Sequence, residues 1–264
     1  MKSAGLQGLL LGIVTAVGVW VLPTALGQPL APGSDPSPTS RARSATPPAK
    51  PLAGVLVAID PGHQLGNRNF ASRINRLVDA GGGVRKTCNT TGTATAAGYP
   101  EATFAWRVAV RMRTQLRQLG ARVQMTRNRN SDDLWGPCVD VRGRFPNRVG
   151  ADVMISLHGD GVADTEQHGF HVIVPGRGPA QRSSLALGQA LRTSLSAKVP
   201  ASSQVADGLV SRSDLGTLNF GRMPRVMLEL GNMRNLADAR RMSRAEGQGM
   251  YATAIVTGLR THLR

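Results

Sequence analysis

The stretch from Val55 to His63 constrains the fold more than any other part of this 264-residue chain. Its apolar run ends abruptly in Asp-Pro-Gly, and His63 follows at once. Such a run is typical of a buried strand, and ligands of open α/β sheets bind just beyond the carboxyl ends of the strands. We therefore predict that His63 stands at the rim of such a sheet as a metal ligand. Taken alone, the stretch fits a plain turn with a surface histidine equally well.

Strands and helices alternate along the chain, which favours the α/β class. The expected strands cover residues 54–59, 122–126, 152–157, 169–174, 205–210 and 224–230. The expected helices cover residues 100–120, 139–149, 180–199, 236–242 and 246–263. Pro146 should kink or break the second of these helices. We expect a single domain with a mostly parallel or mixed sheet of about six strands, flanked by helices on both faces.

The N-terminal 27 residues have the pattern of a secretory signal peptide. Lys2 precedes a mostly apolar core, and Ala25-Leu26-Gly27 is a small-x-small cleavage site. An uncleaved membrane anchor is the alternative, because the apolar run approaches the length of a membrane span. Residues 28–51, rich in Pro, Ser and Ala, are predicted to be a disordered linker, and residues 52–264 to form the folded domain. Both alternatives place that domain outside the cytoplasm, secreted or in the periplasm or cell wall.

Two cysteines, Cys88 and Cys138, are present in the chain. An even count in an oxidising compartment predicts one disulfide. It would close a loop of roughly 50 residues and stabilise the fold by about 4 kcal/mol. Cys88 lies in the stretch 64–98, which is rich in Gly, Asn, Thr and Ala, has no clear periodicity and is predicted to be a functional loop. Free thiols and cysteine metal ligands are the less favoured alternatives.

Ionisable side chains stand at the ends of several predicted strands, although the interior of a buried strand is usually apolar. His63 follows the first strand, His158 follows the third, and Glu229 ends the last. If these strands are parallel neighbours, the three side chains meet at one edge of the sheet. Glu101, at the start of a helix, is a fourth candidate. Two histidines and a carboxylate are a common catalytic zinc set, and a second carboxylate can then move the proton of the attacking water. Each residue taken singly also fits an ordinary structural role.

Four short motifs occur in order along the chain. They are Asp60-Pro61-Gly62-His63, Pro100-Glu101, Ser156-Leu157-His158-Gly159-Asp160 and Glu229-Leu230-Gly231-Asn232-Met233-Arg234-Asn235. Together they resemble the zinc-dependent N-acetylmuramoyl-L-alanine amidases of the Amidase_3 family, over residues 54–263. The compact layout and the cysteine pair resemble in particular the short secreted mycobacterial peptidoglycan amidases.

This resemblance implies that His63, Glu101 and His158 hold one Zn²⁺ ion and that Glu229 is the general base and acid. The reaction would be hydrolysis of the amide bond between N-acetylmuramic acid and the L-alanine of the peptidoglycan stem peptide. Asp60 and Asn232 are candidates for positions behind the metal site, where carboxylates and amides orient ligands. Asp60 equally fits a role in bracing its own turn.

Some residues depart from the usual family pattern. Gln64-Leu65 follow the first motif, Gly159-Asp160 follow the second histidine, and Asn232 replaces an aromatic residue. These departures concern substrate contacts and leave the implied ligands intact. The alternative function is a non-catalytic wall-binding protein that retains the fold, and the complete ligand set argues against it. His171 is expected to be structural or to lie behind the site.

The formal charge of +16 favours anionic partners and becomes +15 without Lys2. We expect a monomer that binds peptidoglycan and docks on anionic wall polymers through its basic surface. Nucleic acid is excluded as a partner, because the chain is exported and lacks an aromatic platform or a reading helix. Contact with a membrane is expected only if the N-terminal segment is not cleaved.

Overall fold

Residues 49–264 are described by the computed structural model. The predicted signal peptide over residues 1–27, and all but the end of the predicted linker, lie outside the described residues. Within residues 49–264, no helix is long and apolar enough to cross a membrane.

Eight strands and nine helical segments make up the described part of the chain. The strands are β1 (Leu56–Pro61), β2 (Leu77–Asp79), β3 (Arg85–Thr87), β4 (Arg122–Met125), β5 (Val153–Asp160), β6 (His171–Pro175), β7 (Leu209–Arg212) and β8 (Arg225–Asn232). The α-helices are α1 (Ala71–Ile74), α2 (Glu101–Gln118), α3 (Val139–Val149), α4 (Gln181–Ser196), α5 (Gly216–Asn219), α6 (Leu236–Ser243) and α7 (Ala245–His262). The 3-10 helices are η1 (Leu65–Asn69) and η2 (Ala206–Gly208).

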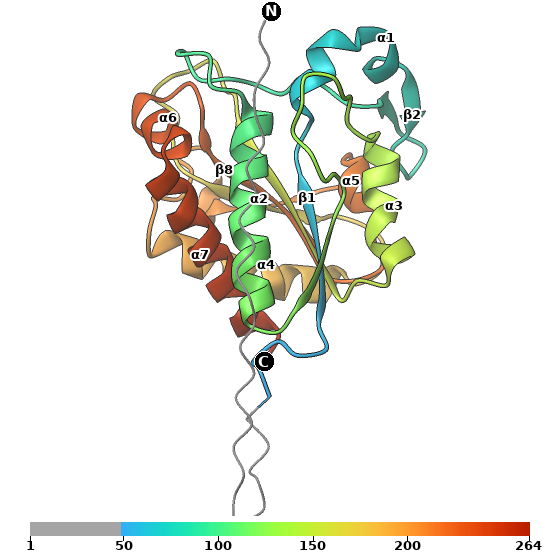
Figure 1. Ribbon diagram of the computed structural model, residues 1–264, viewed down its shortest axis with the longest axis vertical. Helices are drawn as coiled ribbons and strands as arrows, with labels where there is room; N and C mark the ends of the chain where they lie inside the picture. The colour runs from blue at the N-terminus through green and yellow to red at the C-terminus, as the bar shows by residue number, and fades with distance from the viewer. Residues whose placement is uncertain (1–48) are drawn as a thin grey trace, which may run out of the picture. The chain divides into compact units, whose positions relative to one another are not determined.

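Six of these strands form a central sheet in the order β4-β1-β5-β8-β6-β7 (Figure 1). β1 runs parallel to β4 and β5, β5 runs parallel to β8, and β6 runs parallel to β7. Within this sheet only the β6–β8 pair is antiparallel. The predicted α/β domain with a mostly parallel, mixed sheet of six strands is confirmed. Because β1, β5 and β8 are parallel neighbours, the residues at their carboxyl ends come to the same edge.

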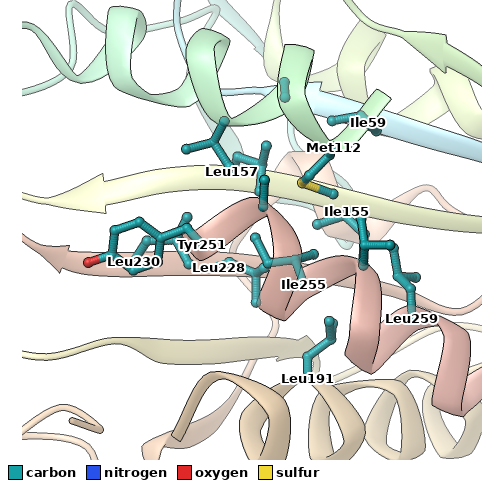
Figure 2. Close-up of a cluster of buried hydrophobic side chains, with 14 of the residues drawn as sticks. Ile59, Met112, Ile155, Leu157, Leu191, Leu228, Leu230, Tyr251, Ile255 and Leu259 are labelled. Atoms are coloured by element: carbon teal, nitrogen blue, oxygen red, sulfur yellow. The ribbon is translucent and has the colours of Figure 1, made fainter. Parts of the chain in front are cut away.

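Helices cover both faces of this sheet. Figure 1 shows α2, α6 and α7 on one side and α3 and α5 on the other. The buried face of α2 consists of Phe104, Val108, Met112 and Leu116, at the predicted spacing of four. They share the largest apolar cluster with strand residues such as Ile59, Ile155 and Leu228 (Figure 2). Full burial of each such side chain contributes roughly 1.5–3 kcal/mol, so this layer holds the strands that carry the site.

Two predicted details of the elements are wrong. Pro146 does not break its helix, and α3 runs from Val139 to Val149. Pro146 lies in the last turn, shortly before Gly150 (φ 66°) ends the helix, so little helix remains for a bend to disrupt. The strand expected over residues 205–210 is β7, Leu209–Arg212, because residues 206–208 form a 3-10 turn with Asp207 in the left-handed region.

The stretch 64–98 contains more structure than expected. It folds into η1, α1 and a hairpin of β2 and β3. The predicted disulfide between Cys88 and Cys138 is confirmed, and it joins the end of this hairpin to the start of α3. The backbone N–H of Val139 also donates to the carbonyl of Cys88 at 2.7 Å. The disulfide therefore attaches the loop to the central domain.

Candidate metal centre

The side chains of His63, Glu101 and His158 meet at the carboxyl end of the sheet. His63 follows β1, Glu101 begins α2, and His158 lies near the carboxyl end of strand β5 rather than after it. Oε1 of Glu101 lies 3.0 Å from Nε2 of His63 and 2.8 Å from Nδ1 of His158. The three ligand atoms all lie within 4.8 Å of one another. Two imidazole nitrogens and a carboxylate oxygen therefore converge, and this is the donor set of many catalytic zinc sites.

Glu101 is almost fully buried at the start of α2. Its Oε2 accepts a hydrogen bond from the backbone N–H of Thr93 at 2.9 Å, and its Oε1 lies 3.2 Å from the N–H of Gly159. Burial by itself raises the pKa of Glu101, but the charge of His63 and the hydrogen bond with His158 outweigh burial and hold that pKa well below its usual range. Its position at the positive end of the helix dipole acts in the same direction. Glu101 is therefore a carboxylate available to a cation.

His63 has an unusual backbone conformation, with a φ of 56°. A residue other than glycine rarely adopts this left-handed conformation, and strain of this kind recurs at functional sites. Nδ1 of His63 lies 3.1 Å from both the carbonyl oxygen and Oγ1 of Thr90. Because a carbonyl oxygen can only accept, Nδ1 carries the proton and Nε2 is left to bind a metal.

Two glycines allow the side chains of these candidate ligands to pack closely together. A Cβ atom on Gly62 would stand 2.5 Å from Cε1 of His158. A Cβ atom on Gly92, whose φ is 75°, would stand 2.8 Å from Oε2 of Glu101 and 2.9 Å from Cδ2 of His63. Any other residue at either position would displace a ligand. The glycine of the Asp-Pro-Gly-His motif is thus required for close packing as well as for the turn.

A buried ion pair lies behind His158. Arg142 of α3 donates from Nε and Nη2 to the two carboxylate oxygens of Asp60, at 2.9 and 2.7 Å. Hydroxyls of Ser156 and Thr126 donate to the same carboxylate at 2.6 and 2.7 Å. Burial would raise the pKa of Asp60, but Arg142 and these hydroxyls hold it far below its usual range. Nη2 of Arg142 also lies 3.0 Å from Nε2 of His158, so Asp60 holds Arg142 against the ring of this histidine.

Sequence reasoning missed Arg142. It identified Asp60 as a residue that could orient a histidine but not the arginine between them. Arg142 is one of three arginines in the predicted helix 139–149, and no sequence signal separates it from exposed Arg144 and Arg148. Only its burial, about 3% exposed, sets it apart. Thr90, which orients His63, also carried no signal.

Glu229 lies in β8, directly opposite His158 of β5 and His171 of β6. Its Oε2 is buried and has no hydrogen-bond partner among the residues that the structure describes. Burial, together with the negative charges of Glu101 and Asp160, raises the pKa of Glu229 well above its ordinary value, while Arg212 opposes this rise. Glu229 is thus a carboxyl group beside the three ligands whose affinity for a proton is enhanced.

A cavity of about 320 Å³ opens over these residues. Its walls include the three ligand residues, Glu229 and Arg142. Further lining comes from the hairpin and the loop after it, from the end of β5, and from the start of α5. The donor set and the side chain of Glu229 therefore face the same cavity.

Other predicted residues lie away from the donor set. The amide nitrogen of Asn232 donates to the carbonyls of Val162, Asp164 and Gln167, so Asn232 organises the loop after β5. His171 sits across from Glu229, and burial lowers its pKa.

Comparisons with known proteins agree with this geometry. Residues 57–261 match the Amidase_3 family, described as N-acetylmuramoyl-L-alanine amidase. The chain is 40% identical over 228 residues to an N-acetylmuramoyl-L-alanine amidase of Mycobacterium tuberculosis, covering 84% of this chain and 91% of that protein.

Solved structures of two mycobacterial proteins are similar. The chain is 37% identical to the N-acetylmuramyl-L-alanine amidase Ami1 of Mycobacterium smegmatis, with a TM-score of 0.76 over 80% of this chain and 98% of that one. It is 39% identical to the apo form of Ami1 of Mycobacterium abscessus, with a TM-score of 0.76 over 81% of this chain and 100% of that one.

Proposed function

This chain belongs to the Amidase_3 family of N-acetylmuramoyl-L-alanine amidases, and from that membership we propose that its metal is zinc, held by His63, Glu101 and His158. It is a metal-dependent amidase whose substrate is peptidoglycan. It hydrolyses the amide bond between N-acetylmuramic acid and the L-alanine of the stem peptide.

The chemistry of the donor atoms also supports the choice of zinc. Calcium and magnesium prefer sites made of oxygen ligands, whereas two imidazoles and one carboxylate suit zinc and leave a fourth position open. The protonated Nδ1 of His63 faces Thr90, so Nε2 is the ligand atom on that side. On His158 the atom that faces Glu101 is Nδ1.

The remaining chemistry belongs to Glu229. When bound, zinc polarises the scissile carbonyl and lowers the pKa of a water molecule to about 7. Glu229 accepts the proton of the attacking water and then donates it to the nitrogen of the departing L-alanine. A raised pKa suits both steps, because the carboxyl must hold the proton before it releases it.

The single observation that carries this mechanism is the unpartnered Oε2 of Glu229. A buried carboxyl oxygen without a hydrogen bond costs free energy, and a role in proton transfer explains its retention. The alternative, a wall-binding protein without catalysis, has no use for such a group beside an intact donor set.

Metal content tests the proposal. The purified full chain is expected to contain about one zinc ion, as measured by elemental mass spectrometry. Chelation should abolish the release of stem peptides from peptidoglycan, and added zinc should restore it. Restoration by magnesium but not by zinc, or full activity of the metal-free protein, would contradict this assignment.

Export and electrostatics would bring the domain to its substrate. We propose that residues 1–27 are a cleaved signal peptide and residues 28–51 a linker that follows it. The basic surface then docks the domain on anionic wall polymer. Arginines contribute strongly to it, and α2 contains four of them but no acid after Glu101.

Salt dependence tests the docking. Co-sedimentation of the inactive Glu229→Gln variant with isolated cell walls should fall several-fold between about 0.05 M and 0.5 M salt, because salt screens exposed charges. Equal binding at both concentrations would rule out a charge-driven contact.

A further inference from the structure

Two cations share one carboxylate beside the cavity of the metal centre. Nζ of Lys86, in β3, lies 2.6 Å from Oδ2 of Asp214. Arg212, at the end of β7, donates from Nε and Nη2 to the two oxygens of the same carboxylate, at 2.9 and 2.7 Å. The side chains of all three residues remain roughly 40% exposed. The group carries a net charge of +1 and is open to a further anion.

Lys86 faces the reaction site. It lines the same cavity as the three ligands and Glu229. The other lining cation in the described range is Arg142, which is already held by Asp60. Lys86 is the cavity cation that a ligand can reach, because its side chain is 37% exposed whereas that of Arg142 is only 4% exposed.

Arg212 lies on the same face of the sheet as Glu229. In β6, His171 pairs with Glu229 and Pro175 pairs with Arg212. Alternate residues of a strand point to the same face, so the residues at positions 171 and 175 share one face, and so do their partners. The charge of Arg212 counters the acids at this edge, since it lowers the pKa of Glu229, which Glu101 and Asp160 raise.

The charge of the substrate is confined to one side of the scissile amide. The amino sugar is uncharged, and the lactyl carboxyl is consumed in the amide itself. The free carboxylates belong to the stem peptide, and the first of them is the α-carboxylate of a D-isoglutamate at the second position. Without a cation, this group would be repelled by Glu101, Asp160 and Glu229.

We propose that Lys86, supported by Arg212, binds the α-carboxylate of the second stem-peptide residue and so determines substrate specificity. Asp214 holds the two cations in place. This inference rests on the proposed function, because it places the peptide on the hairpin side of the metal ligands and the glycan on the other. Lys86 contacts a part of the substrate remote from the scissile bond, so it acts on binding more than on the chemical step.

Two soluble muropeptides test the proposal. They differ only at the second residue, which is D-isoglutamate in one and its amide, isoglutamine, in the other. The wild-type enzyme should prefer the carboxylate form by about tenfold in kcat/KM, a moderate value because the cations are partly exposed. Lys86→Met should remove this preference by raising KM for the carboxylate form only.

Lys198→Met is the matched control, because Lys198 is an exposed lysine in the turn just after α4. It should behave as wild type with both muropeptides. Equal losses on both muropeptides in Lys86→Met, or an unchanged preference, would overturn the inference while leaving the amidase mechanism intact. Failure of the wild-type enzyme to cut either muropeptide would overturn the proposed function and this inference with it.

Discussion

Replacing Glu229 with glutamine is expected to lower kcat by about 1000-fold, because general acid–base catalysis contributes roughly 10²–10⁴-fold. Glutamine keeps the size of the side chain but cannot accept the proton of the attacking water. The zinc content should stay unchanged, because Glu229 is outside the convergent donor set of His63, Glu101 and His158. Steady-state kinetics on a soluble muropeptide and metal analysis of the same preparation measure both quantities.

The pH profile of the wild-type enzyme provides a second measurement. Burial is the largest cause of the raised pKa of Glu229. Activity should therefore decline toward acidic pH as the base becomes protonated. The midpoint of this decline should lie above pH 4.5, the ordinary pKa of this carboxyl. That decline should be absent from the residual activity of Glu229→Gln. Glu246→Gln, an exposed substitution in α7, is the control, and a fully active Glu229→Gln enzyme would exclude the assigned base.

Replacing Arg142 with methionine is expected to destabilise the fold by about 3–5 kcal/mol, because it leaves the buried Asp60 without its ion-pair partner. It should also weaken zinc binding by about tenfold, since Arg142 packs against the His158 ring and its loss lets that ring move. Urea unfolding of the metal-free protein measures the first effect, and competition with a chelator measures the second. Compared with Arg142→Met, the Arg142→Lys variant should recover less than half of the lost stability and of the lost zinc affinity. Lysine cannot make the paired contact with both oxygens of Asp60.

The pH dependence of stability should reverse in this variant. In the wild-type protein the folded-state pKa of Asp60 lies below the unfolded value of about 3.8, so its contribution is present above that pH and is lost as the pH falls further. Without Arg142, burial raises the folded-state pKa. The variant should then gain stability as the pH is lowered from 7 toward 4. Arg148→Met, on the exposed side of α3, should keep the wild-type behaviour. Identical pH slopes in Arg142→Met and wild type would contradict the role given to the pair.

Much of the fold could be predicted from local patterns. The apolar spacing in α2 identified its buried face, and the apolar runs of β1, β5 and β8 identified the central strands. The hairpin of β2 and β3 could not be found in this way. Its strands are three residues each, and they are fixed by the disulfide and by distant contacts such as that between Lys86 and Asp214.

By itself the sequence determined which residues could carry the chemistry. The tertiary structure makes β1, β5 and β8 parallel neighbours, and this brings His63, His158 and Glu229 to one edge of the sheet. Only the tertiary structure decided which residues assist them. Arg142 and Thr90 act on the histidines, and Lys86 lines the cavity. Their roles depend on burial and on contacts between segments far apart in the chain, and periodicity or motif spacing carries no record of such contacts.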